Sequence, residues 1–228
     1  MYAGSKVRTV EEGSFKDCKQ LEVIAFDGSA PAASPASFDG SSPVVYVQPD
    51  ASGWPESGIW NGLSVKTMAA EGGPYEAVAA GSKLTYYVVH NEVIVSKAAL
   101  QQGAESVEVP AFIEGRRVAR IEDMAFAFCF AAREVKLPAH LREIGTLAFY
   151  NCTSLSSLHI PRHASEIGKD AFINCKSLKD IYTSMTCEQA HHRGCDMWGI
   201  GIWHDNAAKT KVLFKATLHC SNGDLIFN

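Results

Sequence analysis

The residues best suited to chemistry are cysteines and histidines near the C-terminus. This group comprises Cys187, His191, His192, Cys195, His204 and the pair His219-Cys220. Thiolate and imidazole are ligands that zinc prefers, but the C-x3-H-H-x2-C spacing matches no common zinc motif. We therefore predict no metal and no cofactor, and keep Cys187, His191, Cys195 and His204 as a minor candidate set. A disulfide among Cys187, Cys195 and Cys220 is the preferred alternative if the protein is extracellular.

No familiar catalytic motif accompanies these residues. The sequence contains no GxGxxG, Walker A, HExxH, GxSxG or CxxC pattern, so we predict that the protein is not an enzyme. The net charge of −4 argues against nucleic acid as a partner. No apolar run approaches the roughly 18–20 residues needed to span a bilayer.

A repeat of 23 residues dominates the second half of the chain. It is clearest in IEDMAFAFC, IGTLAFYNC and IGKDAFINC, which begin at Ile121, Ile144 and Ile167. The positions that keep this period are Ile121, Ile144 and Ile167, then Phe126, Phe149 and Phe172, then Cys129, Cys152 and Cys175. A further copy upstream contains Phe15 and Cys18 at the same spacing. We expect all of these residues in a buried core, with the cysteines acting as small reduced hydrophobes.

A period of 20–29 residues with LxxLxI is typical of a solenoid in which each coil holds a short strand and a turn. In LSSLHI, Leu158 and Ile160 point inward while Ser157 and His159 point outward. The Ala-Phe segment then crosses the opposite side of the coil. The predicted fold is therefore a β-rich leucine-rich repeat solenoid, a right-handed coil of short strands and turns or short helices with terminal β caps.

The run VxxIxxxAFxxCxxLxxLxIP resembles the BspA-like class of bacterial leucine-rich repeats, over roughly half of the chain. Ala132 departs from the leucine expected after Cys129, and Thr183-Ser184 replaces the Ile-Pro that closes a unit. The second departure predicts that the stack ends there. The resemblance implies an extracellular or cell-surface protein that binds other proteins without catalysis, in adhesion or host interaction.

The chain divides into two solenoid pieces in this interpretation. Residues 1–65 hold one coil and a closing β segment, with a mobile loop over Gly28–Pro43, and residues 66–82 form a linker. Residues 83–228 hold a lead-in hairpin at 84–110, repeats at about 118–183 and a C-terminal cap at 184–228. A single coil cannot bury its own faces, so we expect the chain to be a piece of a longer array.

The outward positions of the strands form the candidate binding surface. One column holds Ser106, Glu134, Ser157 and Asp180, and the other holds Glu108, Lys136, His159 and Tyr182. Lys136 and Tyr182 are the favoured contact residues because a long cation and a large amphipathic ring can anchor a partner. The primary prediction is a protein-binding module that uses this face. The alternative is a structural spacer within a larger surface protein.

Overall fold

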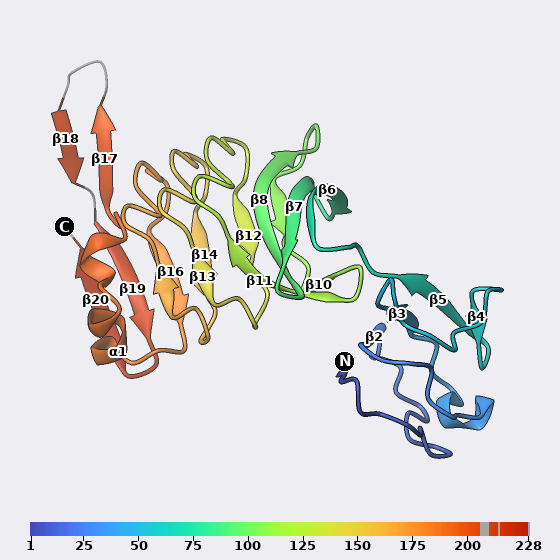
Figure 1. Cartoon of the computed structure of the whole chain (residues 1–228). Coiled ribbons are helices and arrows are strands. Elements are labelled where there is room, and N and C mark those ends of the chain that lie inside the picture. The colour runs from blue at the N-terminus through green and yellow to red at the C-terminus, as the bar shows by residue number, and fades with distance from the viewer. Residues whose placement is uncertain (206–209, 214, 228) are drawn as a thin grey trace. The chain divides into compact units, whose positions relative to one another are not determined.

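The computed structural model describes residues 1–205, 210–213 and 215–227. The chain forms two compact units (Figure 1). The first comprises residues 1–71 together with 112–116, where the short strand β10 (Phe112–Ile113) lies, and the second comprises 72–111 and 117 onward. Among the described residues, no helix combines the length and the apolar character needed to cross a membrane.

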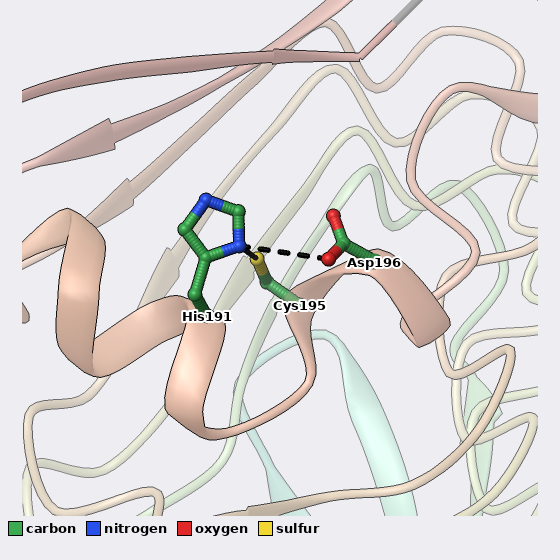
Figure 2. Close-up of side chains that lie close together, drawn as sticks. All are labelled: His191, Cys195 and Asp196. Atoms are coloured by element: carbon green, nitrogen blue, oxygen red, sulfur yellow. Dashed lines mark hydrogen bonds and ion pairs between the residues drawn. The ribbon is translucent and has the colours of Figure 1, made fainter.

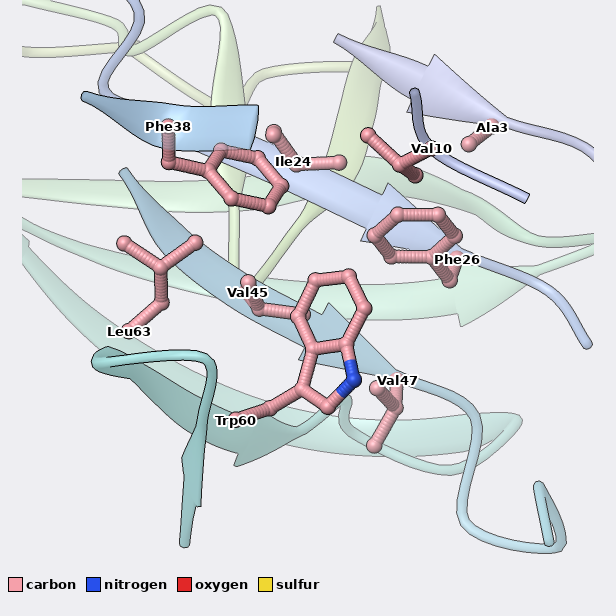
Figure 3. Packing of buried hydrophobic residues seen from close by; sticks show 9 residues of the cluster. All are labelled: Ala3, Val10, Ile24, Phe26, Phe38, Val45, Val47, Trp60 and Leu63. Atoms are coloured by element: carbon pink, nitrogen blue, oxygen red, sulfur yellow. The ribbon is translucent and has the colours of Figure 1, made fainter. Parts of the chain in front are cut away.

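The first unit is a stack of parallel strands. Strands β1 (Tyr2–Ala3), β2 (Val23–Phe26), β3 (Val44–Val47) and β5 (Leu63–Thr67) pair in parallel in this order, and β4 (Ile59–Trp60) pairs antiparallel with β5. Ile24 and Val45 occupy the same register position and point into the core that Figure 3 shows. The stack therefore contains several coils, and the prediction of one coil in residues 1–65 was wrong.

The missed coil lies in the segment Gly28–Pro43, which we expected to be a mobile loop. It forms a 3-10 turn, η1 (Pro35–Phe38), and the ring of Phe38 stacks on that of Phe15 with centroids 5.3 Å apart. The backbone N–H groups of Val10 and Phe15 donate to the carbonyls of Ala32 and Ser37, at 2.8 and 2.9 Å. Alanine, serine and proline replace the usual leucine and cysteine here, which hides a coil whose backbone pairs with the coil before it.

The second unit begins with an antiparallel meander of β6 (Gly72–Ala79), β7 (Ser82–Val89) and β8 (Glu92–Leu100). The expected linker at 66–82 is therefore incorrect over residues 72–79, which form β6. The predicted hairpin is present as β7 and β8. Its turn lacks glycine because His90 and Asn91 adopt the left-handed conformation themselves, with φ of 50° and 66°.

Two parallel sheets form the sides of the second solenoid. In one sheet, β8 pairs in parallel with β11 (Arg116–Ile121), which pairs with β13 (Glu143–Ile144), and β13 pairs with β15 (Glu166–Ile167). The other sheet runs through β9 (Ser106–Glu108), β12 (Glu134–Lys136), β14 (Ser157–Ile160), β16 (Asp180–Thr183) and β19 (Ala216–Cys220), all parallel. Antiparallel β20 (Gly223–Phe227) closes its edge. This architecture confirms the predicted solenoid.

The Ala-Phe turns build the core between these sheets. Phe126, Phe149 and Phe172 are buried and form one row, with ring centroids 5.2 and 5.7 Å apart. The thiols of Cys152 and Cys175 donate to the carbonyls of Phe126 and Phe149, in each case on the preceding coil. The cysteine slot thus supplies a small side chain that also satisfies a buried carbonyl.

The stack does not end at Thr183, contrary to the sequence-based expectation. Strand β16 pairs with β19, so the segment between them forms one longer, irregular coil. This coil contains helix α1 (Cys187–His192) and the 3-10 turn η2 (Cys195–Met197), and β17 (Ile202–Asp205) pairs antiparallel with β18 (Thr210–Leu213). Within the expected C-terminal cap, residues 211–213 therefore belong to β18 and residues 216–218 to β19.

Candidate interaction face

The sheet from β9 to β19 presents two columns of outward side chains, which we call the strand face. The register places Ser106, Glu134, Ser157 and Asp180 in one column and Glu108, Lys136, His159 and Tyr182 in the other. Between them lies a buried file of Val107, Val135, Leu158 and Ile181. The alternation that the sequence indicated therefore places every proposed contact residue on one surface.

Strand β19 extends both columns by one position that the sequence analysis missed. Thr217 lies beside Asp180, and His219 lies beside Tyr182. The irregular coil before β19 breaks the 23-residue period, so no spacing could connect His219 with Tyr182. We had instead grouped His219 with the cysteines of the cap.

His219 is held in place by three neighbours. Its ring stacks on Tyr182, with centroids 4.7 Å apart and planes 16° apart. Its Nε2 lies 3.1 Å from Asp180 and its Nδ1 lies 2.9 Å from Asp224. Hydrogen bonding to Asp180 is the largest cause that raises the pKa of His219 above 6.5, and Asp224 adds to it against the opposing effect of desolvation. An imidazole in contact with two carboxylates thus supports the Tyr182 ring.

Tyr182 is the prominent apolar group of the strand face, with 44% of the residue exposed. Lys136 and His159 are exposed further along the same column. In the other column, Ser106 donates to Glu134 over 3.4 Å. The face thus combines an oriented aromatic ring with charged groups at strand spacing, an arrangement that can bind another macromolecule.

A second group of reactive side chains lies in the cap, where Figure 2 shows His191, Cys195 and Asp196 close together. The Nδ1 atom of His191 is 3.6 Å from the Cys195 sulfur and 3.5 Å from Asp196 Oδ2. The sequence-based candidate set contained His191 and Cys195 but not Asp196, which the left-handed turn at Gly194 brings beside His191. Cys187 does not belong to this close group. The side chain of His204 lies outside the described residues.

All seven cysteines carry free thiols in the structure. Burial raises the pKa of Cys195 to about 11, with a further contribution from Asp196. Burial and the neighbouring Cys187 raise the pKa of Cys220 to about 12. These thiols are therefore largely protonated at neutral pH and make poor nucleophiles.

Comparison with known proteins assigns the repeats. Residues 102–194 match the family described as "BspA type Leucine rich repeat region", in six copies. The array is built of BspA-type leucine-rich repeats. The matched segment contains β9, β12, β14 and β16, so the strand face up to Tyr182 belongs to the BspA-type array. Strand β19, with His219, lies beyond it.

Three solved structures resemble parts of the chain. A T. pallidum leucine-rich repeat protein is 26% identical over 47% of this chain and 60% of its own, with a TM-score of 0.37. A leucine-rich cell surface protein of Faecalibacterium prausnitzii A2-165 is 16% identical over 97% of this chain and 60% of its own, with a TM-score of 0.32. The pneumococcal vaccine antigen PcpA is 16% identical over 81% of this chain and 50% of its own, with a TM-score of 0.34.

The chain thus spans 50–60% of the length of these three structures. A search of curated proteins found no match.

Proposed function

We propose that this chain is a non-catalytic protein-binding module of a bacterial surface or secreted protein, and that its partner lies across the strand face. The observation that carries the proposal is the exposed Tyr182 ring, stacked on His219 within an ordered column of polar side chains. Solenoids commonly bind through such extended surfaces. The repeat type supports a location outside the cell.

Tyr182 supplies the anchor of the proposed interface. Its ring is already oriented by His219, so it loses little conformational freedom on binding. Aromatic side chains that are fixed in this way carry a large share of the binding energy at protein interfaces. Lys136, two strands away in the same column, supplies a long cation.

The charges of the face indicate the chemistry of the partner. Glu108, Glu134 and Asp180 contribute carboxylates, whereas Lys136 contributes an ammonium group. A partner with exposed lysines or arginines around an apolar pocket for Tyr182 complements this pattern. The same excess of carboxylates opposes the binding of nucleic acid.

A matched pair of double variants tests this proposal. Proteins retained from a surface-protein extract by the wild-type chain are identified, and the affinity of each is then measured for Lys136→Ala/Tyr182→Ala. The control, Lys169→Ala/Phe130→Ala, removes an exposed cation and an exposed aromatic ring from the turn segments outside the strand face. We expect the first pair to weaken binding by about tenfold or more and the control to have little effect.

The structural spacer remains the competing function. A spacer requires only that the coils stack. Substitutions on its strand face would therefore leave the affinity for any retained protein unchanged. Equal affinities of both double variants for every retained protein would therefore contradict the interaction face and favour the spacer.

A further inference from the structure

We propose that His191, Cys195 and Asp196 form a zinc-binding site at the end of helix α1. The three ligand atoms lie within 4.8 Å of one another, and Figure 2 shows the three side chains close together. They combine an imidazole nitrogen, a thiol sulfur and a carboxylate oxygen, which are the three kinds of protein ligand that Zn²⁺ takes. The proposal is independent of the strand face and of any partner bound there.

Two of the three distances between the ligand atoms match a tetrahedral ion. With Zn–N near 2.05 Å and Zn–S near 2.3 Å, a tetrahedral angle places nitrogen and sulfur about 3.6 Å apart and nitrogen and oxygen about 3.4 Å apart. The observed separations from His191 Nδ1 are 3.6 Å to the Cys195 sulfur and 3.5 Å to Asp196 Oδ2. The third pair, the Cys195 sulfur and the Asp196 carboxylate oxygen, lies within 4.8 Å, so a small rotation of the exposed Asp196 side chain lets one ion bind all three atoms.

The turn that brings the ligands together is fixed by its own hydrogen bonds. The Arg193 N–H donates to Gln189 O at 3.1 Å, and the Gly194 N–H donates to His191 O at 2.9 Å. Gly194 adopts φ of 71°, a left-handed conformation that glycine tolerates, and so reverses the chain after the helix. Cys195 then begins η2 directly beside His191.

Side-chain contacts hold the same turn against the preceding repeat. The Arg193 guanidinium donates to Ala164 O at 2.8 Å, and the indole N–H of buried Trp198 donates to Arg193 O at 3.2 Å. Ligands on a rigid scaffold lose little freedom when the ion binds. This anchoring distinguishes the group from a chance cluster on a mobile loop.

Exposure determines how the ion would be coordinated. Cys195 is buried, whereas the side chains of His191 and Asp196 are 52% and 72% exposed. An ion in this position would receive the sulfur from the protein side and leave its fourth position to water. On binding, the Cys195 thiol loses one proton to solvent and the imidazole binds through the free Nδ1 lone pair, so affinity must fall as the pH decreases.

A simpler explanation for the geometry is an ion pair between protonated His191 and Asp196 with a weak thiol contact. The two explanations differ in their response to metal. An ion pair needs a protonated imidazole and gains nothing from Zn²⁺, whereas the metal site needs a neutral imidazole and stabilises the fold when Zn²⁺ is added.

Cobalt titration of the full chain tests the site. The chelator-treated protein, kept reduced with a non-thiol reductant, is titrated with Co²⁺ and then with Zn²⁺. We expect one equivalent of Co²⁺ to produce a thiolate-to-metal charge-transfer band and the visible bands of tetrahedral cobalt, and Zn²⁺ to abolish both. The absence of these bands in the wild-type chain would overturn the proposal.

Variants at the exposed ligands identify the site without disturbing the core. His191→Gln and Asp196→Asn should each weaken Co²⁺ affinity by about tenfold or more, since the loss of even an outer-shell partner costs 10–100-fold. The matched control His192→Gln changes the next histidine of the helix, which is exposed and outside the cluster, and should retain wild-type affinity. Bands that survive both ligand variants but disappear in Cys220→Ser would place the metal elsewhere and refute this site.

Discussion

At the scale of single residues, His219 links the last repeat to the cap. It bonds Asp180 on β16 and Asp224 on β20, and it stacks on Tyr182. One ring thus connects three neighbouring strands and orients the main aromatic group of the strand face. Protonation of His219 strengthens both carboxylate contacts, so we expect the packing of the face to depend on pH.

His219 therefore predicts a pH-dependent stability. Its pKa is raised above 6.5 in the folded chain, so its stabilising effect is complete below the unfolded pKa of 6.5 and is lost as the pH rises through the folded pKa. His219→Gln should lower the melting temperature most at about pH 5.5 and least at about pH 8.5. Thermal unfolding of both proteins across this range measures the difference.

A second variant provides the control for this effect. Asp224→Asn removes the smaller of the two hydrogen-bond contributions to the raised pKa of His219 and should shift the wild-type melting curve in the same direction by less. Parallel curves for wild type and His219→Gln at every pH would show that His219 does not contribute through its charge.

Most residues of the strand face could be predicted because alternation along a strand is a local property. Ser157 and His159 point outward for the same reason in any coil. The position of His219 depends on the path of the chain between Thr183 and Ala216, which follows no repeat. Asp196 was missed for a similar reason, since only the left-handed turn at Gly194 brings it to His191.

At the scale of the elements, close packing of one coil on the next restricts one slot of the repeat to small residues. A Cβ atom on Gly145 would lie 2.5 Å from the backbone nitrogen of Asp123 on the preceding coil. A Cβ atom on Gly168 would likewise clash with the backbone of Gly145 and Thr146. Glu122 occupies the equivalent slot of the first of the three repeats, where the restriction to small residues does not yet apply.

Gly168→Ala should therefore destabilise the second unit by about 1–3 kcal/mol, because backbone must move to admit the methyl group. Glu122→Ala is the matched control, since this slot already accepts a side chain, and its effect should remain within about 0.5 kcal/mol. Urea denaturation followed by circular dichroism measures both. Equal effects of the two substitutions would contradict the assigned packing.

The missed coil of the first unit also belongs to this scale. The step from Phe15 to Phe38 is 23 residues, as in the main array, and this step was the available signal. Strand β2 begins eight residues after Phe15, whereas β3 begins only six residues after Phe38. The 23-residue period is therefore not kept by the strand residues. Alanine and serine fill the core positions without a recognisable pattern, although the backbone pairs as in any other coil.

At the scale of the whole chain, the periodic part could be predicted and its ends could not. A repeat fixes the fold because every coil buries the same side chains against its neighbours. The ends must instead cover an open face, and many sequences can do so. Strand β6 covers one sheet edge in residues that we expected to be a linker, and the cap folds through α1 and Trp198 without any repeat signature.

The cap should be essential to the solubility of the array. It pairs β19 with β16, and the Trp198 carbonyl accepts the N–H of Phe172 at 2.8 Å. A chain that ends at Thr183 would expose the β16 edge together with the apolar end of the stack, and open edges of this kind promote association. We expect this truncated chain to form oligomers in size-exclusion chromatography with light scattering. A chain that ends at Ser221 keeps β19 and Trp198 but exposes the β19 edge that β20 covers, so we expect it to associate less than the chain that ends at Thr183. If both truncated chains are monomeric with the melting temperature of the full chain, the cap is not required to close the stack.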